Sequence, residues 1–215
     1  MSIKSGVTYT LITSKGAGSV LAEAALELGR LPYEIDEIPY GEPGPGRDRL
    51  LARNPLGQVP TLVLPDGSTM TESAAIFLHV ADLVPDAGLA PAATDPARPA
   101  FLRWLIFIAA AIYPTFAYGD EPSRWVTDKD AGAELRRRTL EVRQAHWRQI
   151  EGQISPSPWF LGQQFSALDI YVGAMTQWRP GRAWFKAECP KLHAIGLALD
   201  GYPKLAKVWA RNFSE

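Results

Sequence analysis

The N-terminal part of the chain alternates between two β-like runs and one stripe of apolar residues at helical spacing. Residues 7–12 are apolar and β-branched, and residues 33–38 alternate apolar and polar positions, so both segments predict strands. Gly29 is expected to end the helix between them, because a glycine just beyond a helix adopts the left-handed conformation at little cost. The apolar positions that predict this helix are Val20, Leu21, Ala24, Ala25 and Leu28.

The next part of the chain adds a hairpin and two helices. Residues 40–46 hold three glycines and two prolines, which predicts an irregular loop, and 47–53 predicts a short helix. Residues 61–64 and 68–70 flank a Pro-Asp-Gly turn and predict a β-hairpin, and 72–83 predicts another helix. Strands joined through a helix pair in parallel, whereas hairpin strands are antiparallel. The order β-α-β-(α)-β-β-α therefore predicts a small mixed sheet with helices packed on it.

Prolines then break the pattern, and the remainder of the chain has helical spacing. Four prolines fall within residues 83–99, so we expect a linker there. The predicted fold class is an α/β domain over residues 1–84, a linker over 85–98 and an all-helical domain over 99–215. The helices expected in the second domain span 101–113, 130–154, 167–178, 191–199 and 204–212.

Composition and charge are typical of a soluble globular protein. The 215 residues carry 22 Lys and Arg against 23 Asp and Glu, so the net charge is −1 and no basic excess indicates nucleic acid. Cys189 is the single cysteine, which excludes a disulfide within the chain and favours a reducing, cytoplasmic location. The N-terminus lacks the pattern of a signal peptide. The three histidines have no metal-ligand spacing, so we expect no metal.

One uncharged stretch requires a membrane test. Residues 104–119 contain no charged side chain. Pro114 interrupts them, however, and the stretch is shorter than the roughly 20 apolar residues that a membrane span needs. We therefore expect a buried core helix in this part of the chain and no membrane partner.

Three motifs carry the functional signal. The sequence NPLGQVPTL at 54–62 brings a loop to a proline directly before a strand, where a residue without an N–H is tolerated. The sequence TES at 71–73 opens a helix, and FSALDI at 165–170 predicts a helix-capping box. Together with the order of elements, these motifs resemble the cytosolic glutathione transferases over almost the whole chain.

The resemblance implies a fold, a co-substrate and an assembly. It implies a thioredoxin-like first domain, an all-helical second domain that forms the electrophile pocket, glutathione as co-substrate and a homodimer. Among bacterial members, the sequence KGAGS at 15–19 is most similar to the Gly-Ala-Cys-Ser loop of the beta class. This chain departs from that loop because Gly18 stands where the beta class has its cysteine.

The same resemblance implies a binding role for residues of two motifs. In the family, the proline that matches Pro60 is cis, which leaves the backbone of Val59, next to Gln58, free to pair with the cysteinyl part of glutathione. Glu72 and Ser73 would hold the ammonium and carboxylate groups of the γ-glutamyl part, at a helix start that attracts anions. The structural alternatives are a proline that only begins a strand and a polar segment that only caps a helix.

Without a loop cysteine, the glutathione sulfur needs another stabilising group. The start of a helix lowers a thiol pKa through its unpaired N–H groups and positive dipole. Gly18 allows a close approach to this backbone, and either Ser19 or Ser14 could donate a hydroxyl hydrogen bond to the thiolate. A plain N-cap for Ser19, a solvated loop hydroxyl for Ser14 and stabilisation by the backbone alone remain open.

The electrophile pocket is expected to draw on the second domain. Tyr113 stands near the position where beta-class members carry a histidine that faces the thiol, and Phe116 and Tyr118 would line an apolar wall. Ordinary helix packing is the alternative. The function predicted is conjugation of the glutathione thiolate to a small apolar electrophile, as in detoxification. The alternatives are a non-catalytic glutathione-binding or interaction module and a glutathione-dependent thiol-disulfide reductase or peroxidase.

Overall fold

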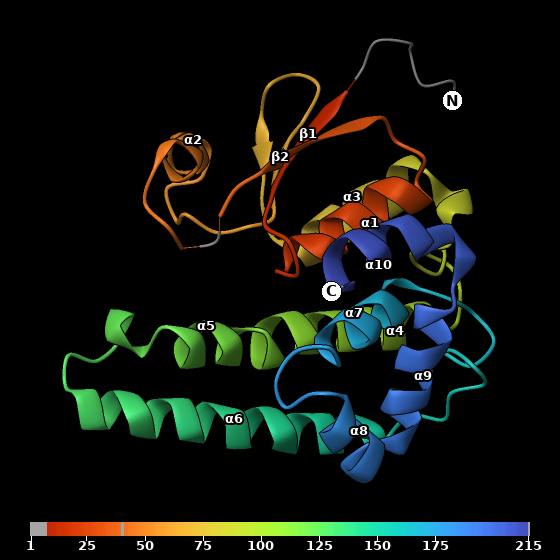
Figure 1. The fold of residues 1–215 in the computed structure, drawn as a ribbon. Helices are drawn as coiled ribbons and strands as arrows, with labels where there is room; N and C mark the ends of the chain where they lie inside the picture. Colours follow the sequence, from red (N-terminus) through yellow and green to blue (C-terminus); the bar gives the residue numbers. More distant parts are fainter. Residues whose placement is uncertain (1–7, 40, 215) are drawn as a thin grey trace. The chain divides into compact units, whose positions relative to one another are not determined.

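The chain folds into two compact units (Figure 1). The computed structural model describes residues 8–39 and 41–214. One unit comprises the described residues up to Ala90 together with the segment from Asp200 onward, and the other spans Pro91–Leu199. The C-terminal segment therefore packs with the N-terminal sheet, although it is the part of the chain most distant from it in sequence.

The first unit is built on a mixed sheet of four strands in the order β2-β1-β3-β4. Strands β1 (Tyr9–Thr13) and β2 (Tyr33–Glu37) are parallel, whereas β3 (Thr61–Val63) and β4 (Thr69–Met70) form an antiparallel hairpin. Strand β3 also pairs antiparallel with β1. This confirms the mixed sheet that the sequence predicts. Val7 of the first predicted strand lies outside the described residues.

Helices α1 (Ser19–Leu28), α2 (Pro45–Arg53) and α3 (Ser73–Leu83) belong to the same unit, and η1 (Pro85–Ala87) follows α3. The predicted loop over 40–46 was too long, because α2 already begins at Pro45, a residue whose fixed φ suits the first helical position. Tyr40 of that loop lies outside the described residues.

The role predicted for Gly29 was wrong. Its φ is −71°, so it stays right-handed, and Arg30 takes the left-handed conformation with φ 50°. A Cβ on Gly29 would lie 2.7 Å from Cγ1 of Val80. Glycine is required here because α1 and α3 approach each other closely, and not because of its backbone angle.

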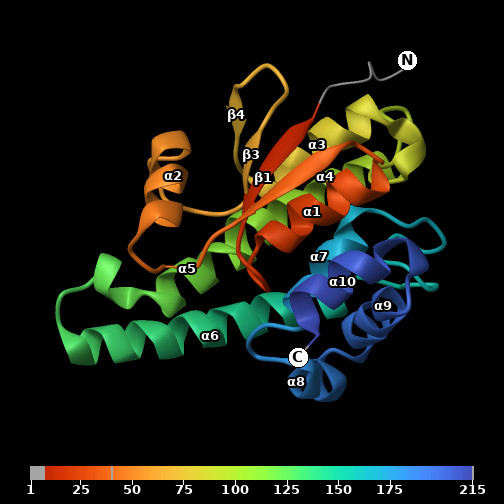
Figure 2. The same ribbon diagram turned by 45° about the horizontal axis from the view of Figure 1, so that its top comes forward.

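The C-terminal segment completes the first unit. It consists of the 3-10 turn η4 (Pro203–Leu205) and helix α10 (Ala206–Phe213). Figures 1 and 2 both show α10 lying alongside α1, with α3 beyond it. The apolar face of α10 buries Val208 and Trp209, and the Trp209 indole donates a hydrogen bond to Asp200 Oδ1 at 3.1 Å.

The regular elements of the second unit's described residues are helices, joined by turns and loops, and two isolated β-bridges lie within 159–164. Helix α8 was not predicted, because its seven residues are too few to show a periodic pattern. Helix α5 was not predicted either, because the predicted helix over 101–113 ended before Pro114, whereas the other predicted helices occur in the predicted order. The helix predicted over 204–212 corresponds to α10 of the first unit. The elements are α4 (Arg98–Phe107), η2 (Ile108–Ile112), α5 (Pro114–Asp120), η3 (Pro122–Arg124), α6 (Lys129–Glu151), α7 (Ala167–Met175), α8 (Arg182–Glu188) and α9 (Pro190–Asp200).

Helices α4 and α5 are continuous with each other. The π-helical turn η2 joins them into one helical segment, Arg98–Asp120. The Tyr113 amide bonds to the carbonyl of Ile108, five residues back, and Pro114 then takes the first position of α5. The expectation that Pro114 interrupts this segment was therefore wrong, and length does not exclude a membrane span. By length and composition it is the one helix of the described chain that could cross a membrane, and 39% of its apolar window is buried.

The predicted capping box at the start of α7 is confirmed. Ser166 is the N-cap, and its Oγ accepts the Leu168 amide at 3.3 Å. Asp169 accepts the Ser166 amide at 2.8 Å through Oδ2 and the Phe160 amide at 2.7 Å through Oδ1. Burial raises the pKa of Asp169 to about 7, while the hydrogen bonds that it accepts act in the opposite direction.

Replacing Asp169 by Asn tests this cap. An amide can accept only one of the two backbone N–H groups, so Asp169→Asn should lower the free energy of unfolding by about 2 kcal/mol. Because the folded-state pKa is raised, the Asp169 contribution is complete below about pH 4 and is lost as pH rises through about 7. Urea unfolding should therefore show a wider gap between wild type and variant at pH 5 than at pH 8.

The matched control is Glu188→Gln, which removes an exposed ion pair with Arg148 and should cost less than about 1 kcal/mol at either pH. An Asp169→Asn protein as stable as wild type at pH 5 would contradict the role of this carboxyl group.

Candidate functional site

The Val59-Pro60 peptide bond is cis, as the resemblance implies. The loop before it is fixed by Asn54, whose Nδ2 donates to the carbonyl of Gln58 at 3.0 Å and to Thr61 Oγ1 at 3.1 Å. Thr61 Oγ1 in turn donates to the same Gln58 carbonyl at 2.8 Å. Asn54 and Thr61 are buried, so this polar cluster holds the turn that presents Val59.

The backbone of Val59 is left without a partner in the described chain, on both its N–H and its C=O. The Val59 side chain packs on the cluster of Ile12, Ile38 and Leu50, which anchors the residue. A residue with a free backbone donor and a free backbone acceptor can form a further strand-like pair of hydrogen bonds. The Gln58 side chain is exposed beside it.

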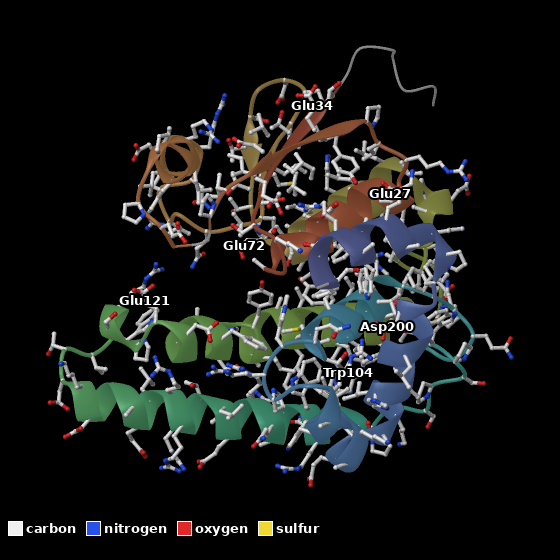
Figure 3. All side chains as sticks on the ribbon, viewed as in Figure 1. Glu27, Glu34, Glu72, Trp104, Glu121 and Asp200 are labelled. Carbon is white, nitrogen blue, oxygen red and sulfur yellow. The ribbon has the colours of Figure 1, made fainter. Side chains whose placement is uncertain are left out.

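Glu72 is held in an unusual conformation at the start of α3. It is the N-cap residue, with φ 64° and ψ 102°, and its carbonyl accepts the Ile76 amide at 3.0 Å. Its side chain makes no capping hydrogen bond and is exposed (Figure 3). The N-cap is therefore Glu72, and not Thr71 or Ser73. Ser73, the first residue of α3, is half-buried.

The sheet brings these segments to one edge. Ile12 pairs with Thr61 and Leu62 pairs with Met70, so β1 and β4 end where β3 begins. The loop after β1, the Val59-Pro60 turn before β3 and the start of α3 after β4 consequently lie next to one another. This arrangement brings together the candidate residues that the sequence predicts for the glutathione site: Ser14, Gly18, Ser19, Gln58, Val59, Pro60, Glu72 and Ser73.

The hydroxyl groups of the first loop bond to one another and to the backbone. Thr13 Oγ1 donates to Ser19 Oγ at 2.6 Å, and Ser19 Oγ donates to the Ser14 carbonyl at 3.2 Å. Ser14 Oγ donates to the Ile38 carbonyl at 2.6 Å. All three hydroxyl-bearing residues are buried, and each hydroxyl proton already has an acceptor.

The structure excludes one of the alternatives left open for Ser19, that of a plain N-cap. The N-cap of α1 is Gly18, which has no side chain to make a capping hydrogen bond, and Ser19 is the first helical residue. Ser19 Oγ instead accepts the Ser14 amide at 3.2 Å, so it closes the loop that precedes the helix.

Two backbone amide groups at the start of α1 make no hydrogen bond within the described chain. The Gly16 amide donates to Asn212 Oδ1 at 3.1 Å, and the Ala17 amide donates to the Ser14 carbonyl at 3.1 Å. The Gly18 and Ser19 amides have no acceptor within residues 8–39 and 41–214. Unpaired N–H groups at a helix start carry partial positive charge, so these two can stabilise an anion.

A cavity of about 410 Å³ opens beside this loop. Glu37, which forms part of its wall, accepts a hydrogen bond from Arg211 Nη1 at 2.6 Å. The exposed ammonium group of Lys15 stands at the same cavity. The lining residues are Ser14, Lys15, Glu37, Ile38 and Pro39.

In the second unit, Tyr113 and Phe116 form an aromatic cluster with Trp178. The ring centroids lie 6.1 Å apart for Tyr113 and Phe116 and 5.6 Å apart for Phe116 and Trp178. Tyr118 is not part of this cluster, because its ring packs edge-on against Trp125 at 4.7 Å.

Arg143 supports this cluster, and the sequence reasoning missed it. Its Cζ lies 3.4 Å from the centre of the Phe116 ring, and its guanidinium donates to Oγ1 and the carbonyl of Thr115 and to the carbonyl of Arg179. Burial lowers the pKa of Arg143 to about 10. The only sequence signal was one arginine among many on a long polar helix.

The single thiol of the chain belongs to Cys189. Cys189 is buried in the second unit, and burial raises its pKa to about 12, so it is protonated near neutrality. Within the described part of the chain, no three His, Cys, Asp or Glu side chains are grouped to hold a metal ion.

Comparison with known proteins identifies the family. The sequence model of the glutathione S-transferase N-terminal domain matches residues 22–83. An Escherichia coli K12 protein named uncharacterized GST-like protein YncG is 37% identical over 198 residues, covering 92% of this chain and 95% of its own. The chain belongs to the glutathione S-transferase family.

Solved transferases share the fold. A glutathione transferase homologue from Sulfitobacter with bound glutathione is 27% identical, with a TM-score of 0.79 over 94% of this chain and 97% of its own. A sphingomonad glutathione S-transferase complexed with glutathione is also 27% identical, with a TM-score of 0.76 over 96% of this chain and all of its own. The thioredoxin-like first domain and the helical region that follows it are thereby confirmed.

The strained conformation of Glu72 predicts an unusual response to substitution. A non-glycine residue at positive φ costs about 1–3 kcal/mol, whereas an added glycine normally costs about 0.5–1 kcal/mol in chain entropy. Glu72→Gly should therefore leave the unfolding free energy unchanged or raise it by up to about 1 kcal/mol. Thermal and urea unfolding measure this difference.

Arg30→Gly is the matched control, because Arg30 is the other non-glycine residue of the described chain with positive φ. It should show the same stability response without any effect on glutathione binding. A loss of more than about 1 kcal/mol in Glu72→Gly would show that Glu72 stabilises α3 rather than straining it.

Proposed function

We propose that this transferase binds glutathione at the edge formed by the first loop, the Val59-Pro60 turn and the start of α3. The Val59 backbone pairs with the cysteinyl part of the tripeptide. Glu72 and Ser73 hold its γ-glutamyl ammonium and carboxylate groups. The amides of Gly18 and Ser19 receive the sulfur, which attacks a small apolar electrophile.

The observation that carries this proposal is the pair of unpaired amides at the start of α1. The hydroxyl protons of Thr13, Ser14 and Ser19 are all donated inside the protein, so a thiolate would have to break a bond to use them. The backbone needs no such rearrangement. We therefore assign the stabilisation of the thiolate to the backbone and give Ser14 and Ser19 the role of shaping the loop.

The electrophile side of the proposal rests on the aromatic cluster. Tyr113 and Phe116, with Trp178, supply an apolar surface, and the Tyr113 hydroxyl can donate a hydrogen bond but is a weak base near neutral pH. Tyr118, whose ring packs edge-on against Trp125 outside this cluster, would add a separate apolar contact. A flat, apolar electrophile with a good leaving group matches this chemistry.

No covalent bond to the protein is required in this reaction. The glutathione thiol loses its proton to solvent, the thiolate forms the new C–S bond, and the leaving group departs with the electron pair of the bond that breaks. Cys189, buried and protonated, takes no part. Family membership further leads us to propose a cytoplasmic homodimer, which light scattering would test.

Two measurements on the wild-type protein test the function. Calorimetry should detect glutathione binding, and turnover should be seen with a panel of aryl halides such as a chloro-dinitrobenzene. Binding without turnover on any electrophile would favour a non-catalytic binding module. Turnover restricted to a hydroxyethyl disulfide or a peroxide would favour a reductase or peroxidase that uses the sulfur of glutathione alone.

Removing each loop hydroxyl tests the backbone assignment. In Ser14→Ala and Ser19→Ala, the pKa of bound glutathione, read from thiolate ultraviolet absorbance against pH, should stay within about 0.3 of the wild-type value. A direct hydroxyl donor would instead raise it by about 1 unit when removed. Ser19→Ala should also lose about 1–2 kcal/mol of stability, because the Thr13 hydroxyl loses its acceptor.

Ser68→Ala provides the control for a lost hydroxyl, since Ser68 lies in the exposed β3–β4 turn and its hydroxyl donates to Asp66 Oδ1 at 2.6 Å. The backbone assignment would be wrong if either loop variant raised the thiol pKa by about 1 unit while Ser68→Ala left it unchanged. The serine replaced in that variant would then be the hydroxyl donor to the thiolate.

A further inference from the structure

Helix α10 reaches the loop that precedes α1 through one side chain. Asn212 Oδ1 accepts the Gly16 amide at 3.1 Å across 196 residues of sequence. Its Nδ2 donates to Glu23 Oε2 at 3.0 Å and to the Val208 carbonyl at 2.9 Å. Asn212 is 5% exposed, and each of its polar atoms has a partner.

Arg211, the neighbouring residue, extends the same contact to both strands that border the site. Its guanidinium binds the buried carboxylate of Glu23 through Nε at 2.9 Å and through Nη2. It also binds Glu37, at the end of β2, at 2.6 Å, and its Nη2 lies 3.5 Å from Thr13 Oγ1 at the end of β1. Glu23 is 3% exposed, so Arg211 is the counter-ion that makes its burial tolerable.

Packing alone does not account for these polar residues. An apolar side chain at position 212 would fill the same space against α1, as Val208 and Trp209 already do. Asn212 instead supplies one acceptor to a single amide of the loop. Gly16 there has φ 71°, and a Cβ on it would lie 3.4 Å from the Asn212 carbonyl, so the loop and the end of α10 fit closely.

We propose that Asn212 and Arg211 are positioning residues that hold the first loop so that the Gly18 and Ser19 amides, and not the Gly16 amide, face the ligand. Asn212 occupies the Gly16 amide, and the Ser14 carbonyl occupies the Ala17 amide, which leaves the next two donors for the sulfur. This inference rests on the proposed function, because it concerns the group that stabilises the thiolate. Neither residue touches the substrate in this scheme.

Asn212→Ala removes the acceptor of the Gly16 amide and is the primary test. With the loop less ordered, the pKa of bound glutathione should rise by about 0.5–1 unit, and kcat/KM should fall roughly 10-fold at neutral pH. Arg211→Met, which keeps the apolar stem, should act in the same direction. Lys207→Ala, on the exposed face of α10, should leave both values unchanged.

Hydrogen–deuterium exchange on the free protein gives a readout that does not depend on catalysis. Peptides that cover residues 13–21 should exchange faster in Asn212→Ala than in the wild type or in Lys207→Ala. The thermal midpoint, measured in parallel, shows how much of each effect is a general loss of stability.

The outcomes separate the two proposals. A variant with lower stability but an unchanged thiol pKa, an unchanged Kd for glutathione and unchanged exchange in 13–21 would overturn the positioning role and leave the proposed function intact. Wild-type protein that shows no binding at millimolar glutathione would overturn the proposed function. Faster exchange in 13–21 of Asn212→Ala would then still support control of the loop by α10, and unchanged exchange would overturn it.

Discussion

The proposed site depends on the hydrogen bonding of the backbone amides at the start of α1. A helix leaves its first N–H groups without partners inside the helix, and a folded protein supplies acceptors for most of them. Here the Ser14 carbonyl and the Asn212 side chain accept hydrogen bonds from two amides of the preceding turn, whereas the amides of Gly18 and Ser19 have no acceptor in the described chain. Under the proposed function, these two amides would supply the electrostatic part of thiolate stabilisation in a family member without a loop cysteine.

The buried polar groups around this turn define one loop conformation. The Thr13 hydroxyl donates to Ser19 Oγ, the Ser14 hydroxyl donates to the Ile38 carbonyl, and Glu23 is neutralised by Arg211. Each group would be costly to bury alone, so the groups are stable only in a complete network. In the proposed scheme, the lack of a side chain at Gly18 would let a ligand approach its amide closely. The site is thus made of backbone that the surrounding side chains hold in place.

The second unit shows the same use of buried polarity on an aromatic surface. Arg143 has no carboxylate bonded to it among the described residues, yet three carbonyl or hydroxyl oxygens and the face of Phe116 replace its hydration. A cation held in this way fixes the ring of Phe116.

The sequence by itself determined most of the elements, the mixed sheet, the capping box at Ser166 and the glutathione-transferase-like motif around Pro60, because these depend on local periodicity, turn chemistry and short motifs. It correctly predicted that α1 ends at Gly29, but it attributed the glycine to a left-handed backbone. The actual reason is the close approach of Val80 on α3, which no local pattern in α1 reveals. It also left Ser14, Ser19 and the backbone equal as thiolate donors. Only the tertiary structure decided where each hydroxyl proton goes and brought Asn212 and Arg211 to the first loop. The partner of a hydrogen bond across 196 residues is set by how α10 packs on α1, and no local pattern encodes it.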